Sequence, residues 1–377
     1  MILSGHPWIY RDALAPCSLA PGEPVDVIDR RGRVIARGLA EAGPIAVRVF
    51  STGPQERFDQ ELLCRRVRMA FALRGQALPP DTTAYRLLHG EGDRLPGVVC
   101  DRYGEFAVLK LDGEAAAARR DDFVHALREP LRELGVRGLL GRYSRKQQSG
   151  VTPIEGDQPP DEVEVSECGM KLLVNLWSGQ KTGLFLDHRA SRARVRGLAR
   201  GLDVLNLYGY TGGFSVAAGL GGAKSVTTVD IAQPAVDLAQ RTFVHNQLAS
   251  ALHRVVARDV PDFLRDAVQA GERYDLIVCD PPNFAPNEAS LERALDSYVQ
   301  LHAASLALLA PGGLYLAASC SSHVRADAFV ETLRGGARRA RRVLSVLEQS
   351  GAPFDHPRLL AFPEGDYLKV ALCRVSD

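Results

Sequence analysis

The chain has 377 residues, of which 46% are hydrophobic and 24% are charged, and its formal net charge is +1 at pH 7. This length predicts two or three domains of an ordinary soluble protein, since domains typically contain about 100–200 residues. So small a net charge argues neither for nor against a nucleic-acid partner, which only local basic patches could indicate. No apolar run approaches the roughly 20 residues of a membrane span. Seven cysteines without C-x-x-C pairs predict reduced thiols and no bound metal. The amino terminus lacks a basic start and an apolar core, which predicts a cytoplasmic protein.

Residues 1–70 are predicted to form a small β unit followed by a linker helix. Short alternating strands are expected at 25–29, 33–37 and 45–50, and the apolar spacing of 56–74 predicts a helix. Small β units of this size bind RNA, or they only pack against a neighbouring domain. The pattern alone does not decide between these two roles.

Residues 71–175 are predicted to form a mixed α/β domain. It should contain strands at 98–100 and 106–111, a helix at 115–134, a surface loop at 155–162 and a closing hairpin at 163–165 and 171–174. Arg142, Arg145 and Lys146 lie between the helix and the hairpin, beside one tyrosine. Such a segment can contact RNA phosphates and a base, although segments of this composition are more often solvated loops that bind nothing.

Residues 176–377 are predicted to form a doubly wound α/β domain. A glycine-punctuated loop should lead into a helix near Asp187, its predicted N-cap. The expected strands lie at 203–207, 226–231, 254–259, 274–279, 314–319, 343–347 and 367–375. The expected helices lie at 213–220, 233–245, 261–270, 291–309 and 326–337. Sequential βα units mean a mainly parallel sheet, and the ending suits seven strands of which the last is antiparallel.

The glycine-rich turn at 209–213 follows the first of these strands. It should bring backbone N–H groups to the carboxyl edge of the sheet, where α/β folds bind nucleotide-like ligands, although a generic tight turn uses the same residues. Asp230 and Asp259 end the next two strands, and the first of them can bind ribose hydroxyls. The bulky Tyr210 inside the turn disfavours a pyrophosphate, so we expect S-adenosylmethionine rather than NAD.

Two cysteines occupy predicted strand ends. Because side chains alternate along a strand, Cys279 should point into the core if Asp280 points toward the ligand. Cys320 instead begins a polar loop and should face the same edge as Asp280. A thiolate that adds to carbon 6 of a pyrimidine makes carbon 5 nucleophilic, with an acid at N3. We predict Cys320 as this nucleophile and Asp280 as the N3 partner. Base N-methylation at Asp280-Pro-Pro, and an RNA-binding or assembly protein without turnover, stay as alternatives.

Four segments in order, 179–189, 206–214, 280–284 and 319–321, carry a resemblance that covers nearly the whole chain. With them the chain resembles the ribosomal RNA large-subunit methyltransferase I family, cytosine-5 methyltransferases that act on 23S rRNA. The resemblance implies an N-terminal PUA domain that binds RNA, a central ββαββ domain and a seven-stranded, Rossmann-like class I methyltransferase domain. It also implies RNA as the partner and leaves a homodimer open.

The resemblance further implies S-adenosylmethionine as cofactor and Cys320 as nucleophile. The expected cofactor contacts, with their neighbours at the same strand ends, are Lys181, Thr182, Phe185, Arg189, Asn206, Tyr208, Tyr210, Thr211, Gly212, Asp230, Ile231, Asp259, Val260, Asp280 and Pro281. Two departures stand out. Asn283 follows Asp-Pro-Pro where the family commonly has lysine, and no releasing cysteine of the kind found in related enzymes follows that motif.

Overall fold

The computed structural model describes residues 4–53, 56–145 and 148–376, and it divides into two compact units. The first unit combines the chain up to Glu167 with Val174–Leu186 and Phe354–Gly365. The second combines Cys168–Leu173, Asp187–Pro353 and the residues from Asp366 onward. None of the described helices is long and apolar enough to cross a membrane. The division into three domains at 70 and 175 stays a prediction.

A four-stranded antiparallel sheet opens the first unit, in the order β1-β4-β3-β2. Its strands are β1 (Trp8–Tyr10), β2 (Pro24–Ile28), β3 (Val34–Ala40) and β4 (Ile45–Ser51). The three predicted strands are therefore confirmed. The following helix α1 (Gln60–Ala77) begins four residues later than predicted. Asp59 sets this start, because its carboxylate accepts the backbone N–H of Leu62 at 2.8 Å as an N-cap.

The second sheet of this unit has five strands in the order β5-β6-β7-β8-β9. They are β5 (Ala84–His89), β6 (Val98–Tyr103), β7 (Phe106–Leu111), β8 (Gly138–Arg145) and β9 (Gln148–Gly156). The single helix predicted at 115–134 is in fact two, α2 (Gly113–Ala118) and α3 (Arg120–Glu133). They are separated by Arg119, whose backbone is not helical at φ −106° and ψ 20°.

The basic segment predicted between helix and hairpin is not a loop. It ends β8, which pairs antiparallel with β9 so that Arg142 lies opposite Val151 and Tyr143 opposite Gly150. The predicted surface loop at 155–162 is shorter than expected for the same reason, because β9 continues to Gly156. The strands predicted near the end of this region are present as β10 (Val163–Glu167) and β11 (Met170–Val174).

The second unit is built on a seven-stranded sheet in the order β14-β13-β12-β15-β16-β18-β17. The strands are β12 (Asp203–Leu207), β13 (Ser225–Asp230), β14 (His253–Ala257), β15 (Tyr274–Cys279), β16 (Leu309–Ser319), β17 (Val343–Ser350) and β18 (Lys369–Ser376). The last strand, β18, runs antiparallel to both of its neighbours, and β12 to β16 are parallel. The predicted fold class is thus confirmed.

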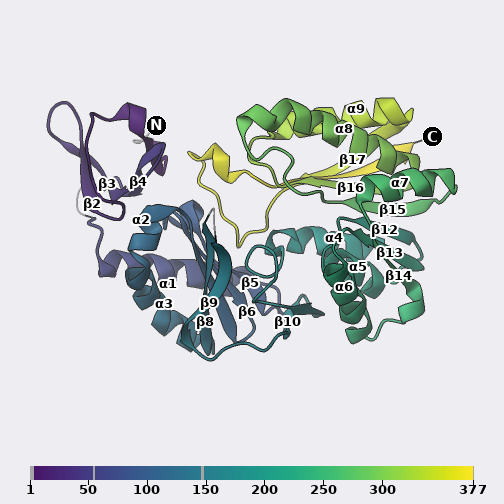
Figure 1. Ribbon diagram of the computed structural model, residues 1–377, viewed down its shortest axis with the longest axis horizontal. Coiled ribbons are helices and arrows are strands. Elements are labelled where there is room, and N and C mark those ends of the chain that lie inside the picture. Colours follow the sequence, from purple (N-terminus) through teal and green to yellow (C-terminus); the bar gives the residue numbers. More distant parts are fainter. Residues whose placement is uncertain (1–3, 54–55, 146–147, 377) are drawn as a thin grey trace. The chain divides into compact units, whose positions relative to one another are not determined.

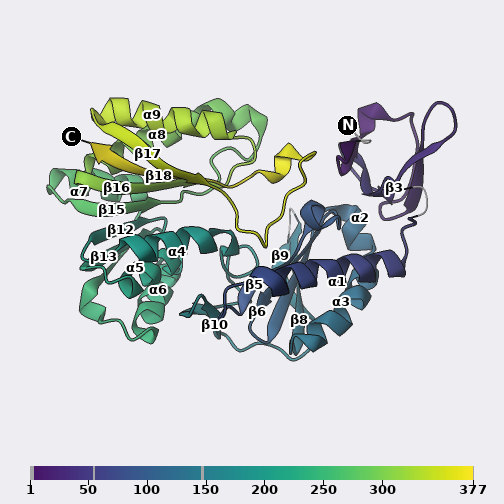
Figure 2. The same cartoon turned by 180° about the vertical axis from the view of Figure 1, so that it is seen from behind.

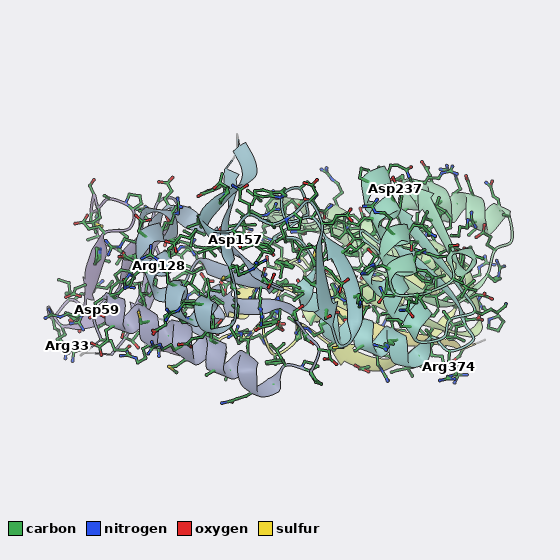
Figure 3. All side chains as sticks on the ribbon, turned by 90° about the horizontal axis from the view of Figure 1, so that it is seen from below. Arg33, Asp59, Arg128, Asp157, Asp237 and Arg374 are labelled. Carbon is green, nitrogen blue, oxygen red and sulfur yellow. The ribbon has the colours of Figure 1, made fainter. Side chains whose placement is uncertain are left out.

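Six helices cover this sheet. On one face lie α4 (Arg189–Leu198), α5 (Gly213–Leu220) and α6 (Gln233–His245), and on the other α7 (Val260–Gln269), α8 (Leu291–Ala307) and α9 (Ala326–Ala340) (Figures 1 and 2). The core against α7, α8 and α9 includes Ile277, Tyr298 and Phe329, none of them more than 2% exposed. Each such side chain contributes about 1.5–3 kcal/mol of burial free energy. Charged side chains such as Asp237 project outward from the helices (Figure 3).

One connection of the second unit's sheet belongs to the first unit. Phe354–Gly365, which we call the strap, lies between β17 and β18 in the chain but packs with the first unit. The carboxylate of Asp355 accepts the backbone N–H of Arg86 at 3.0 Å, and its carbonyl accepts the Arg74 guanidinium at 2.7 Å. The ring of Phe362 meets Trp8 edge to face, with centroids 4.6 Å apart. The strap therefore completes the interior of the first unit.

Candidate active site

The carboxyl ends of the parallel strands bring the predicted residues of the second unit to one edge. Leu207 at the end of β12 pairs with Cys279 at the end of β15, and Cys279 pairs with Ala317 near the end of β16. The residues that follow these ends, Asp280 and Cys320 among them, therefore share that edge. Cys279 itself is fully buried in the core, as predicted, and burial raises the pKa of its thiol to about 12.

The glycine-rich turn after β12 is tightly constrained. Tyr208 and Tyr210 adopt left-handed backbone conformations, with φ of 56° and 45°, which cost non-glycine residues of order 1–3 kcal/mol each. A Cβ on Gly209 would lie 2.4 Å from Cγ2 of Thr228, so only glycine fits there. Strain of this kind persists where the surrounding structure enforces it, and it is typical of ligand sites.

Asp230 ties the turn to the end of β13. One carboxylate oxygen accepts the backbone N–H of Tyr210 at 2.9 Å, and the other accepts that of Ala232 at 3.0 Å. These two bonds orient the carboxylate at the edge where a ribose would bind. Beside it, Ile231 is 72% exposed, an unusual position for a large apolar side chain that suits contact with a flat aromatic ligand.

A chain of buried polar side chains runs beneath the turn. The Asn206 amide donates to the Ser215 hydroxyl at 2.9 Å, which bonds Thr228 at 2.6 Å, which in turn bonds His253 Nε2 at 2.6 Å. Burial lowers the pKa of His253 to about 4, so its ring is neutral at pH 7. The network joins β12, α5, β13 and β14. Apart from Asn206, the sequence did not predict its members.

Asp280 has a partner that sequence reasoning missed. Its carboxylate lies 3.1 Å from Nε2 of His188, a side chain only 2% exposed. The imidazole also meets the Phe214 ring edge to face at 5.5 Å. Two buried contacts thus fix the ring that holds the Asp280 carboxylate. His188 follows Asp187, whose predicted N-cap role is wrong, since its carboxylate accepts the Tyr367 hydroxyl at 2.9 Å and α4 has no side-chain cap.

Cys320 is half-buried and follows directly on β16. The serines on either side are fixed, because the Ser319 hydroxyl bonds the Tyr298 hydroxyl at 2.9 Å and the Ser321 hydroxyl donates to the Ala285 carbonyl at 3.0 Å. The thiol therefore sits on a backbone held from both sides. Among the described residues, no cluster of His, Cys, Asp or Glu could hold a metal ion.

The other predicted cofactor residues of the second unit differ in exposure. Asp259 is exposed just before α7, whereas the following side chains are buried: Arg189, Asn206, Thr211, Val260 and Pro281. A buried side chain can still present its backbone to a ligand, as glycine-rich sites do. The bare backbone of the turn, two carboxylates and one exposed apolar side chain together fit an adenosine-bearing cofactor without phosphates.

Three predicted cofactor residues belong to the first unit. The Thr182 hydroxyl donates to the buried Asp101 carboxylate at 2.5 Å and bonds the Tyr103 hydroxyl at 2.8 Å. The ammonium of Lys181 lies 4.3 Å from the centroid of the Phe185 ring, a cation–π contact. Thr182 therefore anchors the loop that carries the other two, and their contact with the cofactor stays a prediction.

The predicted RNA-binding residues lie on β8 and beyond it. Arg142 is half-buried and donates to the Leu176 carbonyl at 3.4 Å, and Tyr143 is 37% exposed. Arg145 is the last residue of β8, and Lys146 lies outside the described residues. Their role in binding RNA stays a prediction.

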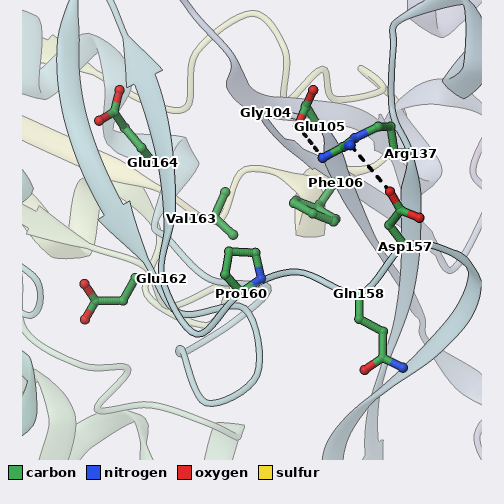
Figure 4. Close-up of a pocket in the computed structure, with 10 residues that line it drawn as sticks. All are labelled: Gly104, Glu105, Phe106, Arg137, Asp157, Gln158, Pro160, Glu162, Val163 and Glu164. Carbon is green, nitrogen blue, oxygen red and sulfur yellow. Dashed lines mark hydrogen bonds and ion pairs between the residues drawn. The ribbon is translucent and has the colours of Figure 1, made fainter.

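A separate open hollow of about 680 Å³ lies in the first unit and contains none of the predicted site residues. Glu105 and Asp157 lie on its wall, and Arg137 pairs with both, at 2.8 and 3.6 Å (Figure 4). Glu162 and Glu164 also line the hollow, so four carboxylates face one guanidinium and the wall disfavours an anionic ligand such as RNA.

Comparison with known proteins identifies the family and its cofactor. Residues 136–361 match the family described as S-adenosylmethionine-dependent methyltransferase, and residues 1–52 match a PUA-like domain. Ribosomal RNA large subunit methyltransferase I of Cronobacter sakazakii is 37% identical over 381 residues, which cover 99% of this chain and 96% of that protein. The Erwinia tasmaniensis protein of the same name is also 37% identical, with the same coverage.

Solved structures agree in fold. The methyltransferase SMU.776, crystallised with S-adenosylhomocysteine, superimposes with a TM-score of 0.88 and 26% identity, covering 99% of this chain and 96% of that one. Trm5b from Pyrococcus abyssi matches with a TM-score of 0.55 at 16% identity over 74% of this chain and 75% of its own, which shows a shared fold only.

Proposed function

Since the chain belongs to the ribosomal RNA large subunit methyltransferase I family and is S-adenosylmethionine-dependent, we propose that it methylates carbon 5 of a cytosine in 23S rRNA. One observation carries the cytosine-5 chemistry. Cys320 and Asp280 directly follow β16 and β15, which are neighbouring parallel strands in register. A nucleophile and an acid are thus available at one edge to act on the two sides of a pyrimidine ring.

The cofactor supplies an electrophilic methyl group on a sulfonium. Cys320 Sγ forms a bond to carbon 6 of the cytosine, and the electron pair of the C5–C6 double bond moves into the ring. Asp280 in its acid form donates a hydrogen bond to N3 and so stabilises the negative charge that develops there, while His188 Nε2, 3.1 Å away, holds the Asp280 carboxyl group in place. The electron pair made available at carbon 5 forms the bond to the methyl group. Water then accepts the proton of carbon 5, the pair of that C–H bond re-forms the C5–C6 double bond, and the C6–S bond breaks to restore the Cys320 thiolate.

The target base must leave its stack to reach Cys320. Unstacking costs a few kcal/mol and is easiest in single-stranded or loop RNA, which is the substrate we expect. The PUA-like domain and the end of β8 with Arg142 and Arg145 are proposed to hold the flanking RNA strand through its phosphates.

Replacement of Cys320 by Ala tests the proposal. We expect methyl transfer from labelled cofactor to unmodified 23S rRNA to be abolished, while calorimetry shows unchanged cofactor binding. Cys17→Ala removes an exposed thiol elsewhere and should leave activity unchanged. RNA containing 5-fluorocytosine, which cannot lose its C5 substituent, should form a denaturant-stable adduct with the native protein and with Cys17→Ala, but not with Cys320→Ala.

Two outcomes would replace the proposal. Full activity of Cys320→Ala would favour base N-methylation at Asp280-Pro-Pro, and mass spectrometry of the product nucleoside would show N-methylated base instead of 5-methylcytidine. Absence of label in any RNA, under conditions where the cofactor binds, would favour an RNA-binding protein without turnover.

A further inference from the structure

A buried lysine lies directly against the segment that carries the proposed nucleophile. Lys369 opens β18 and pairs in register with Ser319, the residue before Cys320. The side chain is only 6% exposed, and its ammonium donates to the carbonyl oxygens of Ser321 and, at 2.9 Å, Tyr367. A buried ammonium is unfavourable unless an opposite charge accompanies it.

No carboxylate of the described residues is bonded to this ammonium, although the charge of Asp366 acts on it from a distance. In the part of the chain that the structure describes, no carboxylate oxygen lies within 4.0 Å of it, and its two hydrogen-bond acceptors are neutral carbonyls. Burial lowers the pKa of Lys369 to about 8, and the two groups that counter this effect are Asp366 and Cys320. Of these, only the thiol is a group whose charge the proposed chemistry requires.

We propose that Lys369 is a positioning residue whose ammonium is the counter-charge of the Cys320 thiolate. This inference rests on the proposed function, in which Cys320 attacks as a thiolate. The thiol proton leaves to solvent and the resulting anion remains beside the ammonium. When the sulfur bonds to carbon 6 and later departs, the same ammonium stabilises the thiolate as leaving group. A neighbouring cation brings cysteine pKa values from about 8.5 to about 3.5–7.5 in reactive thiols.

Four other titratable groups of the second unit, Tyr298, Asp280, Asp366 and His323, do not supply this charge. Tyr298 of α8 acts electrostatically with Cys320 and Asp280, and burial, its largest influence, raises its pKa, so it is neutral. Asp280 and Asp366 are acids and disfavour a thiolate. His323, three residues after Cys320, is exposed to solvent. The placement of Lys369 against the Cys320 segment makes it a cation able to act on the sulfur.

The rate of alkylation of Cys320, measured as a function of pH, tests the ion pair between Lys369 and Cys320. The midpoint of this curve is the pH at which the rate is half of its maximum. Tryptic cleavage after Arg293 and Arg325 yields a peptide in which Cys320 is the only cysteine, so mass spectrometry can follow its reaction with iodoacetamide. Lys369→Gln keeps hydrogen-bond donors for both carbonyls but removes the charge. Lys369→Arg keeps the charge. Lys224→Gln is the matched control, because Lys224 is 70% exposed and pairs with Asp203.

We expect the alkylation midpoint of Lys369→Gln to rise by at least about one pH unit, which lowers the rate at pH 7 about tenfold. Lys369→Arg and Lys224→Gln should retain the native midpoint. A Lys369→Gln midpoint equal to the native one, in protein with native cofactor binding and melting temperature, would overturn the inference. If Lys369→Gln does not fold, the alkylation midpoint of the native protein is the test: a midpoint below about 7.5 supports the ion pair, and any higher midpoint refutes it.

The same measurements separate this inference from the proposed function. Alkylation needs neither RNA nor turnover, so it reports on the thiol whatever the enzyme methylates. If Cys320→Ala stays active, the cytosine-5 mechanism fails, and the comparison of Lys369→Gln with native protein still shows whether the ammonium sets the state of the sulfur.

Discussion

Replacement of Gly212 by Ala should damage the cofactor turn in a way that can be calculated from the structure. Gly212 has φ of +78°, and a Cβ there would lie 2.7 Å from Cβ and 3.1 Å from Cα of Ala239 on α6. The left-handed backbone costs a residue with a Cβ about 1–2 kcal/mol. The clash adds about 1–3 kcal/mol, because α5 and α6 must separate or the turn must move. We therefore expect the free energy of unfolding to fall by about 2–5 kcal/mol.

Gly222→Ala provides a matched control for the backbone strain. Gly222 has φ of +84°, but the atoms nearest to its added Cβ would be 3.9 Å away. This variant should lose only the backbone contribution, about 1–2 kcal/mol. Urea unfolding of both variants, followed by circular dichroism, measures the difference between them. Calorimetry should show weaker S-adenosylmethionine binding by Gly212→Ala alone, since Gly222 follows the far end of α5.

Equal destabilisation by the two substitutions would refute this reasoning. It would mean that the contact between the turn and Ala239 relaxes without cost, and that the glycine serves only the backbone conformation. Unchanged cofactor affinity in Gly212→Ala would likewise show that the turn does not position the ligand.

Further predictions concern the same edge and its supports. Asp230→Ala should weaken cofactor binding about tenfold in calorimetry, or about 1.4 kcal/mol, and an unchanged affinity would exclude it from the site. His188→Gln can still donate to Asp280 and should methylate RNA nearly as fast as the native protein. His188→Ala cannot, and its methylation rate should be about 10- to 100-fold lower. Equal methylation rates of the two variants would exclude a positioning role for His188. Acid should destabilise the fold, because burial lowers the pKa of His253 to about 4 and of His302 to about 3. As the pH falls below about 6.5, these histidines take up protons in the unfolded chain but not in the folded chain. The free energy of unfolding present above about pH 6.5 is therefore lost toward about pH 4, by about 3 kcal/mol for His253. Urea unfolding at pH 7 and 4.5 measures this loss, and no difference would contradict it.

Local patterns predicted the second unit well because its elements obey simple periodicities. Several parallel strands are short runs rich in Val, Leu or Ile that lead into a polar or glycine-rich segment, so the residues after them could be assigned to one edge. Consecutive side chains of a strand point to opposite faces of the sheet, so Cys279 and Asp280 could be assigned to opposite faces without knowing which strands lie beside them. The single helix predicted at 115–134 failed, because the non-helical Arg119 lies in a stretch that otherwise favours helix.

The partners of the site residues could not be predicted in this way. His188 meets Asp280 across 92 positions of the chain, and Lys369 meets Ser321 across 48. Such contacts depend on how separate elements pack, and neither residue carries a local signature. Thr182 shows the opposite case, a local signature whose side chain has a structural partner. Its place in a glycine-rich motif suggested contact with a ligand, but its hydroxyl donates to Asp101.

The strap has a consequence for how the chain is made. Its residues are synthesised roughly 170 positions after the preceding segment of the first unit, and at about 5–20 residues per second that interval is about 10–30 s. During this time Trp8 lacks one of its ring partners, Phe362, and Arg74 lacks one of its acceptors, the carbonyl of Asp355. The amino-terminal part of the nascent chain must therefore wait, incompletely closed, until nearly the whole protein has left the ribosome. A fragment that ends at Leu186 should accordingly be a poor folding unit, and a chaperone that holds early chains should raise the yield of the full-length protein more than that of the fragment.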